Sequence, residues 1–241
     1  MKFYSTVFDT VEINSSFYSD IPRKVVSSWI REYGRKNFLF SVKAPRTITH
    51  QYLKEGYDQS LPLMDKFLED LIWPLKDNRI LGRVLFQLPP FSGTGDLVTL
   101  LNILKDSDLR GAEVRIEVRS DSTIRSDEVF RSIEKSGYLG VIQDSPDIPI
   151  DESASKVRHS DYVRLHGRNR ELWDAPGSGL GRYRYNYSEV EVSNIYSIIN
   201  GLDKVGDDIF IYFNNHPGGS STINAMSMQV LAGTGNRAKL F

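Results

Sequence analysis

Apolar residues in this chain fall into short runs that alternate with longer stretches of helical spacing. Seven runs rich in β-branched and aromatic residues predict strands, at residues 7–13, 38–43, 82–88, 111–118, 138–143, 161–166 and 208–214. Most of these runs are nearly continuous rather than alternating, which is typical of parallel strands buried on both faces. The pattern therefore favours a parallel sheet covered by helices.

The stretches between the strands carry apolar residues at helical spacing. Residues 22–33 predict a helix with Pro22 in its first turn and Gly34 at its stop, and residues 61–72 predict a second that Pro74 ends or kinks. Further helices are predicted around residues 97–104 and over 221–232. Another begins after an N-cap at Ser126 and ends at Gly137, and another begins at the capping box of Ser188 and Glu191 and runs to Ile199.

Repeated strand–helix units with short connections predict an α/β fold, a TIM-type (β/α) barrel with about seven recognisable strands. The length of 241 residues suits one such barrel, and no linker separates two domains, so residues 1–241 are expected to form a single domain.

Composition narrows the function classes. The chain has 30 Lys and Arg against 31 Asp and Glu, a net charge of -1, so no overall positive field attracts nucleic acid or a membrane surface. It has no cysteine, which excludes thiol catalysis and Cys-ligated zinc. The chain shows neither a secretion signal nor a long apolar span, so we expect a cytoplasmic protein.

In a (β/α) barrel the active site lies at the carboxyl ends of the strands. Polar residues end every predicted strand, and the candidate site residues are Glu12, Asn14, Lys43, Gln87, Glu117, Arg119, Asp144, Arg164, His166, Asn214 and Asn215. Any one of them is more often a satisfied structural residue, but seven strands that agree favour a functional pocket.

The candidate residues suit an enzyme that acts on a small anionic substrate. A phosphate group would give such a substrate its negative charge. Glu117 and His166 are the predicted proton-transfer residues, because a histidine titrates near neutral pH. Lys43, Arg119 and Arg164 would bind charge, and a Schiff base on Lys43 is an alternative catalytic role. The other candidates would bind and orient the substrate. His50 and His216 are weaker candidates for catalysis.

A divalent metal held by Glu117, Asp144 and His166 is a further alternative. The neighbouring Arg119 and Arg164 and the small number of histidines disfavour it, so no metal ligand is assigned and the cofactor stays open.

Two segments suggest other ligands. Residues 169–187 interleave Arg and aromatic side chains in a long connection, which predicts a mobile lid. Such a segment also suits a nucleotide or nucleic acid as partner. The alternative function is therefore nucleic-acid or nucleotide binding, which includes a metal-dependent phosphodiesterase. Residues 214–222 lead into a helix through Gly and Ser, an arrangement that binds anions, although an ordinary capped turn has the same pattern.

Several of these stretches also carry a family resemblance. The segments VEINSSFY from Val11, FSVKAP from Phe40, LFQLPP from Leu85, EVR from Glu117, YVRLHGR from Tyr162 and YFNN from Tyr212 closely resemble the YecE-like family, domain of unknown function 72. The resemblance covers essentially the whole chain and implies a (β/α)₈-type barrel without assigning a reaction.

One departure from that family concerns the first strand. Members resemble one another in a Gly-Thr-Ser-Gly-Trp strand before the Glu-Ile-Asn motif, whereas this chain starts a few residues ahead of Glu12. The resemblance therefore implies a barrel that lacks its first strand, closed by seven strands, by upstream residues or by a partner subunit.

Overall fold

The computed structural model describes residues 2–51, 57–119, 126–173, 175, 177, 179–202, 208–215 and 217–233. The chain divides into two compact units, Met1–Leu139 and Gly140–Phe241, and each is described by itself.

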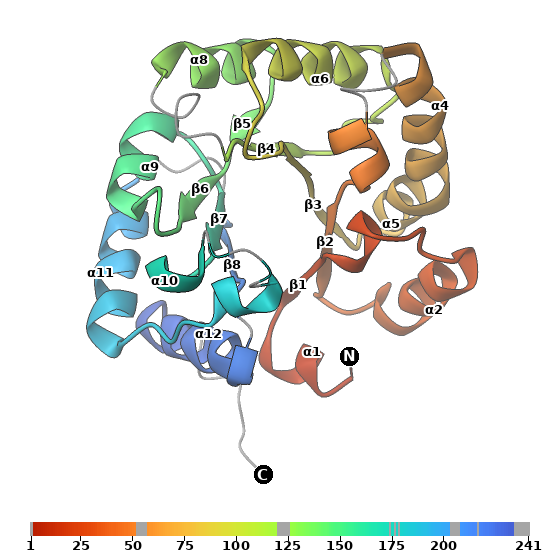
Figure 1. Cartoon of the computed structure of the whole chain (residues 1–241). Coiled ribbons are helices and arrows are strands. Elements are labelled where there is room, and N and C mark those ends of the chain that lie inside the picture. Colours follow the sequence, from red (N-terminus) through yellow and green to blue (C-terminus); the bar gives the residue numbers. More distant parts are fainter. Residues whose placement is uncertain are drawn as a thin grey trace. The chain divides into compact units, whose positions relative to one another are not determined.

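The first unit is built on a sheet in which neighbouring strands follow the chain order, β1-β2-β3-β4-β5. Its strands are β1 (Thr10–Ile13), β2 (Leu39–Lys43), β3 (Leu81–Gln87) and β4 (Val114–Glu117), and β5 (Leu139–Gly140) spans the last residue of this unit and the first of the next. The pairs β1–β2, β2–β3 and β3–β4 are parallel, so the carboxyl ends of these strands lie at one edge of the sheet (Figure 1).

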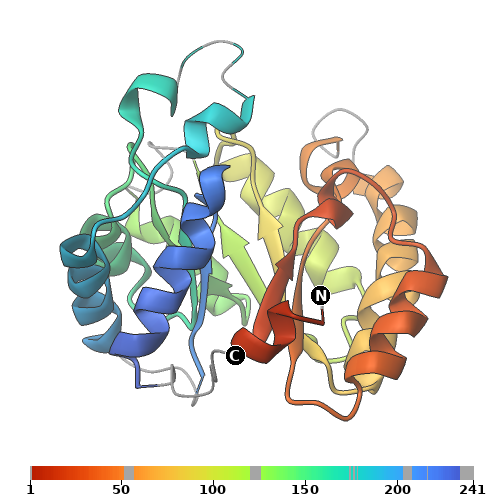
Figure 2. The same cartoon turned by 90° about the horizontal axis from the view of Figure 1, so that it is seen from below.

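Helices connect the strands of the first unit. They are α1 (Tyr4–Val7), α2 (Arg23–Tyr33), α4 (Tyr57–Phe67), α5 (Trp73–Asp77), α6 (Thr94–Asp106) and α8 (Asp127–Lys135), with 3₁₀ turn η1 (Ser15–Phe17) and π-helical turns η2 (Thr47–Gln51) and η3 (Leu68–Ile72). Tyr33 from α2 packs on Phe38 and Phe40, and all three are buried. Figure 2 shows α2, α4 and α5 on one side of strands β1 to β3.

The second unit has a parallel sheet of three strands in the order β6-β7-β8. The strands are β6 (Ile142–Asp144), β7 (Tyr162–Leu165) and β8 (Phe210–Phe213). The helices are α9 (Ile150–Val157), α10 (Arg170–Trp173), α11 (Glu189–Asn200) and α12 (Ser220–Leu231). Two 3₁₀ turns complete the unit, η4 (Gly179–Tyr183) and η5 (Pro217–Gly219). α9 packs on β6, α12 packs on β8, and α11 contacts both helices (Figure 1).

The predicted mixed α/β fold with parallel sheets is confirmed. The strand predictions at 38–43, 82–88, 161–166 and 208–214 match β2, β3, β7 and β8, and the capping box of Ser188 and Glu191 opens α11. Closure of the strands into a barrel stays a prediction.

Four predictions of local structure need correction. The run 7–13 is a strand only from Thr10, because Tyr4 and Phe8 pack together across the single turn of α1. Residues 138–143 form two short strands interrupted at Val141, and Pro74 opens α5 instead of ending a helix, since a proline fits the first turn. The segment 169–187 is not one irregular loop, because it contains α10 and η4; its mobility stays a prediction.

In the described part of the chain, no helix has the length and apolar character needed to cross a membrane.

Candidate functional site

Three strand ends of the first unit carry a hydrogen-bonded row of polar side chains. Lys43 Nζ donates to Gln87 Oε1 over 2.7 Å, and Gln87 Nε2 donates to Glu117 Oε1 over 2.8 Å. Gln87 and Glu117 are directly paired in the register of β3 and β4, and Lys43 pairs with Leu85, two residues before Gln87 and on the same face. The structure therefore brings these three predicted residues together.

The row is buried. Lys43 and Gln87 expose 8% and 6% of their surface and Glu117 exposes none. An unpaired charge at such a depth costs several kcal/mol, so the amide of Gln87 stabilises the row by accepting from the ammonium and donating to the carboxylate.

Other predicted residues of the first unit flank this row. Arg119 Nε lies 4.0 Å from Glu117 Oε1, with 13% of its side chain exposed. Asn14 Nδ2 donates to Glu12 Oε1 over 2.9 Å at the end of β1, and Glu12 stands in register with Ser41 of β2, on the same face as Lys43. The first unit thus holds six of the predicted candidates: Glu12, Asn14, Lys43, Gln87, Glu117 and Arg119.

His50 lies beside the same row, although the sequence indicated His50 only as a weak candidate for catalysis. Its ring packs edge-on against Phe17 at a centroid distance of 5.1 Å, and Lys43 Nζ lies 4.0 Å from the centroid of Phe17. Burial and then the positive charges of Lys43, Arg46 and Arg119 lower the pKa of His50 to about 4. His50 is therefore neutral at pH 7, and its environment is cationic.

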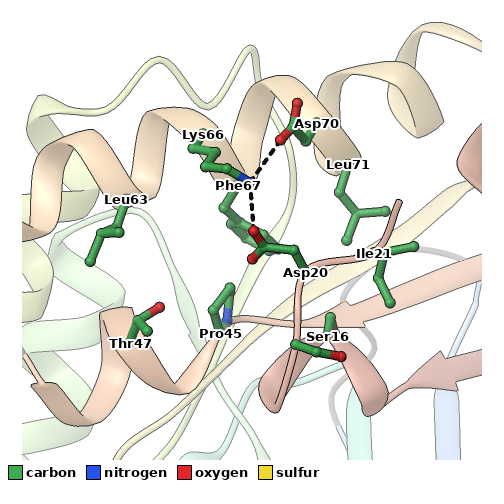
Figure 3. A pocket seen from close by; sticks show the side chains of 11 residues that line it. Ser16, Asp20, Ile21, Pro45, Thr47, Leu63, Lys66, Phe67, Asp70 and Leu71 are labelled. Carbon is green, nitrogen blue, oxygen red and sulfur yellow. Dashed lines mark hydrogen bonds and ion pairs between the residues drawn. The ribbon is translucent and has the colours of Figure 1, made fainter. Parts of the chain in front are cut away.

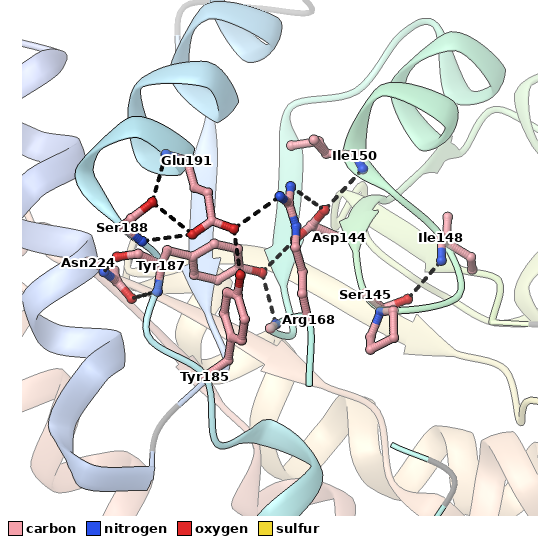
Figure 4. A network of polar contacts seen from close by, with 12 residues as sticks. Asp144, Ser145, Ile148, Ile150, Arg168, Tyr185, Tyr187, Ser188, Glu191 and Asn224 are labelled. Carbon is pink, nitrogen blue, oxygen red and sulfur yellow. Dashed lines mark hydrogen bonds and ion pairs between the residues drawn. The ribbon is translucent and has the colours of Figure 1, made fainter. Parts of the chain in front are cut away.

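The second unit holds a separate polar network around Asp144 (Figure 4). Arg168 donates Nε to Oδ2 over 2.8 Å and Nη2 to Oδ1 over 2.9 Å, the Tyr187 hydroxyl donates to Oδ2 over 2.7 Å, and the backbone N–H of Ile150 donates to Oδ1 over 3.1 Å. Four donors fill the acceptor capacity of a carboxylate. A ligand at Asp144 would have to displace one of them, so the geometry favours a structural role.

The network extends to the start of α11. Glu191 Oε1 accepts from the Tyr185 hydroxyl over 2.5 Å and from Arg168 Nη1 over 3.2 Å. Burial and Asp144 raise the pKa of Tyr187 well above its ordinary value, and burial and Glu191 raise that of Tyr185 to about 12. Against the effect of burial, hydrogen bonds from Tyr185 and Ser188 lower the pKa of Glu191. Both tyrosines therefore act as neutral donors.

The remaining predicted residues also lie in the second unit. Arg164 and His166 are buried, and the His166 ring lies 6.4 Å from Trp173 and 6.2 Å from Tyr183, measured between centroids. Asn215 Nδ2 donates to Tyr185 O and Asn224 Oδ1, which ties the end of β8 to α12. Asn214 follows β8 directly, and His216 lies outside the described residues.

A pocket of about 300 Å³ opens on the first unit, lined by residues of the segment 16–21, of α4 and of η3, together with Pro45 and Thr47 (Figure 3). Lys66 Nζ bonds to Asp20 over 2.6 Å and to Asp70 over 3.0 Å at its rim. The lining includes none of the predicted site residues, and sequence pattern alone carried no signal for it.

Sequence reasoning passed over several residues that the structure makes central. Arg168 received no site role and Glu191 was predicted only as a capping-box residue, but both belong to the Asp144 network. Arg46 and Phe17 received no role, although both lie close to His50. Among the described residues, no three His, Asp or Glu side chains are arranged to hold a metal ion.

The two parallel sheets with helical connections and polar strand ends define a mixed α/β protein. The chain belongs to the family described as protein of unknown function DUF72, whose model matches residues 1–239. The UPF0759 protein YunF of Bacillus subtilis (strain 168) is 29% identical over 241 residues, which cover 95% of this chain and 84% of that protein.

Solved structures share the fold. A DUF72 family protein from Thermotoga maritima MSB8 (TM1631) superposes with a TM-score of 0.75 at 24% identity, covering 96% of this chain and 87% of the other. One from Enterococcus faecalis V583 (EF0366) gives a TM-score of 0.75 at 21% identity, covering 95% and 86%. At these identities the likeness concerns the fold alone.

Proposed function

We propose that this protein is an enzyme that binds a small anionic substrate, with a phosphate or carboxylate group, at the carboxyl ends of β2, β3 and β4. The observation that carries the proposal is the buried row of Lys43, Gln87 and Glu117, with Arg119 beside its carboxylate. Perturbed and buried charges gathered at strand ends are typical of functional sites in parallel α/β folds.

The balance of charge supports an anionic substrate. The charges of Lys43, Arg46 and Arg119 all lower the pKa of His50. Glu117 is the carboxylate of the row and accepts a hydrogen bond from Gln87. A substrate anion would interact favourably with these cations, since charge-assisted hydrogen bonds are stronger than neutral ones.

The chemistry available to the row is proton transfer. Glu117 accepts from the amide of Gln87 and lies beside Arg119, which would place its carboxylate to take a proton from a substrate held by Arg119. Lys43 contacts an amide oxygen and the face of Phe17, and both contacts favour the charged ammonium. We therefore assign Lys43 to charge binding instead of a Schiff base.

Arg164, His166, Asn214 and Asn215 lie in the second unit, and their part in the same chemistry remains the prediction made from sequence. The proposed site stands on the first unit alone.

A thermal-shift and calorimetric screen tests the proposal with inorganic phosphate, sugar phosphates and small dicarboxylates. A ligand at a hundred times its Kd stabilises the native state by about 2.7 kcal/mol. Arg119→Gln should weaken binding at least tenfold, because it removes a charge at the site. Arg83→Gln is the matched control: Arg83 is on β3 of the same sheet, pairs with Glu113, and exposes 15% of its side chain against 13% for Arg119.

Loss of binding in Arg119→Gln with retention in Arg83→Gln supports the proposed site. Equal affinities in the two variants would contradict it. Binding only of oligonucleotides, with log affinity falling steeply against log salt, would instead support the nucleic-acid function that the Arg- and Tyr-rich segment suggested. Once a substrate is found, Glu117→Gln should bind it but turn it over far more slowly.

A further inference from the structure

The ring of His50 is held in place from two sides. Thr49 Oγ1 lies 2.8 Å from Nδ1, and Phe17 packs against the ring with an interplanar angle of 76°. Phe17 belongs to η1 and His50 to η2, so two segments that follow neighbouring strands fix this side chain. A ring fixed in this way is prepared for a directed hydrogen bond.

The hydrogen-bond distances indicate which nitrogen carries the proton. The Thr49 hydroxyl has one proton and two neighbouring acceptors, Nδ1 of His50 at 2.8 Å and the carbonyl oxygen of Pro45 at 3.3 Å. Hydroxyl hydrogen bonds to oxygen are strongest at about 2.7–2.8 Å, so the bond to the Pro45 carbonyl is a long one and the contact to Nδ1 is the shorter. We assign the hydroxyl proton to the shorter contact, which places the ring proton on Nε2.

Three cations act on this ring. Lys43 ends β2, Arg46 follows it, and Arg119 follows β4, while η1 contributes the aromatic ring of Phe17. No carboxylate of the described residues is among the groups that shift the pKa of His50. Protonation of His50 would add a further positive charge to this cluster, so the imidazole stays neutral at physiological pH.

We propose that His50 is a substrate-contacting residue of the anion site, whose neutral imidazole donates its Nε2–H to an oxygen of the bound phosphate or carboxylate. The inference rests on the proposed function and names a residue and a protonation state for it. The cations supply the charge for binding, and the imidazole supplies a directed donor without any uptake of a proton. A neutral donor of this type also stabilises negative charge that develops on a substrate oxygen.

Nuclear magnetic resonance of the histidine rings tests the inference on the full chain. The protein has four histidines, so long-range proton–nitrogen spectra of ¹⁵N-histidine-labelled protein give four ring patterns, and His50→Gln assigns one of them. We expect the His50 pattern to show protonated Nε2 and unprotonated Nδ1, unchanged from about pH 8 down to about pH 5. Inorganic phosphate, or the tightest-binding anion of the screen, should shift the Nε2–H resonance.

The binding variants give a second readout. His50→Ala should weaken anion binding about tenfold, because a hydrogen bond to a charged group is lost. His50→Gln keeps a neutral N–H donor and should retain part of that affinity. His159→Ala, at an exposed histidine of the second unit, should bind like the wild type.

The outcomes separate the two proposals. If no anion binds, the proposed function fails and the inference fails with it. If an anion binds in an Arg119-dependent way but His50 carries its proton on Nδ1, titrates near pH 6.5, or keeps its Nε2–H resonance unshifted, the inference alone is overturned.

Discussion

Arg168 binds both carboxylate oxygens of Asp144, from Nε to Oδ2 over 2.8 Å and from Nη2 to Oδ1 over 2.9 Å. Asp144 ends β6, and Arg168 follows β7, so this bidentate pair joins two neighbouring strand ends. Tyr187 links the segment before α11 to both strand ends, since its hydroxyl donates to Asp144 and accepts from the backbone N–H of Gly167. The network thereby fixes the segment that leads into α11.

Asp144→Asn should destabilise the protein substantially. The variant removes the fully buried carboxylate that Arg168 binds with two nitrogens and leaves Glu191, at 3.2 Å, as its counter-charge; breaking a buried ion pair costs about 3–5 kcal/mol. Because 34% of the Arg168 side chain is exposed, solvent screens part of the loss, and we expect about 2–3 kcal/mol. Urea unfolding measures it. The control is Glu32→Gln, which breaks the exposed pair with Lys36 and should cost far less; equal losses would contradict a central role for Asp144.

Gly167→Ala should also destabilise, and for a steric reason. Gly167 has φ +86°, and an added Cβ would lie 2.6 Å from Cβ of Tyr185. The backbone would have to move, which would disturb the hydrogen bond from Gly167 to Tyr187; we expect a cost of about 2–3 kcal/mol.

Gly177→Ala is the matched control for that substitution. Gly177 also has a positive φ, +74°, but an added Cβ would meet nothing within 4 Å. It therefore reports the backbone cost alone, about 1 kcal/mol. A thermal-unfolding comparison in which both variants lose the same stability would show that the contact with Tyr185 is unimportant.

Periodicity predicted the elements well because burial on both faces leaves a strong signal in a parallel strand. Strands β2, β3 and β7 lie within or within a residue of their predicted ranges. The failures have local causes: the aromatic pair of Tyr4 and Phe8 closes a helical turn inside an apolar run, and Pro74 is compatible with a first turn. Neither is visible to a pattern that records only which residues are apolar.

The candidate site was predictable to the extent that strand register decides it. Lys43, Gln87 and Glu117 meet because parallel register places them on one face. The Asp144 network was not predictable, because Tyr185 and Tyr187 come from a connecting segment whose path no spacing rule determines. The lowered pKa of His50 likewise depends on its burial and on three cations from different parts of the chain.

Gln87→Met should show how far the row depends on its central amide. The substitution keeps the volume but leaves the ammonium of Lys43 and the carboxylate of Glu117 without the amide between them, so we expect a loss of about 2–3 kcal/mol. In a double-mutant cycle with Lys43→Met the two losses should be less than additive, because the residues are direct partners. Strict additivity in urea unfolding would show that the row is not a coupled unit.

The pH dependence of stability should carry the signature of His50. Its native pKa is about 4, below the 6.5 of an unperturbed histidine, because burial and the neighbouring cations disfavour the charged ring. Between these two values the unfolded state binds a proton that the native state does not. The free energy of unfolding therefore falls as the pH is lowered from about 6.5 to about 4, and this contribution is constant above about pH 7.

His50→Gln removes that contribution, and comparison with it cancels the carboxylates and the other histidines that titrate in the same range. Urea unfolding of both proteins at several pH values should give curves that run parallel above about pH 7 and diverge below about pH 6, with the wild type losing more stability toward acid. Curves that stay parallel down to pH 4 would mean that His50 titrates normally in the native state. In that case the cations do not act on its ring, and its role as a neutral donor loses its physical basis.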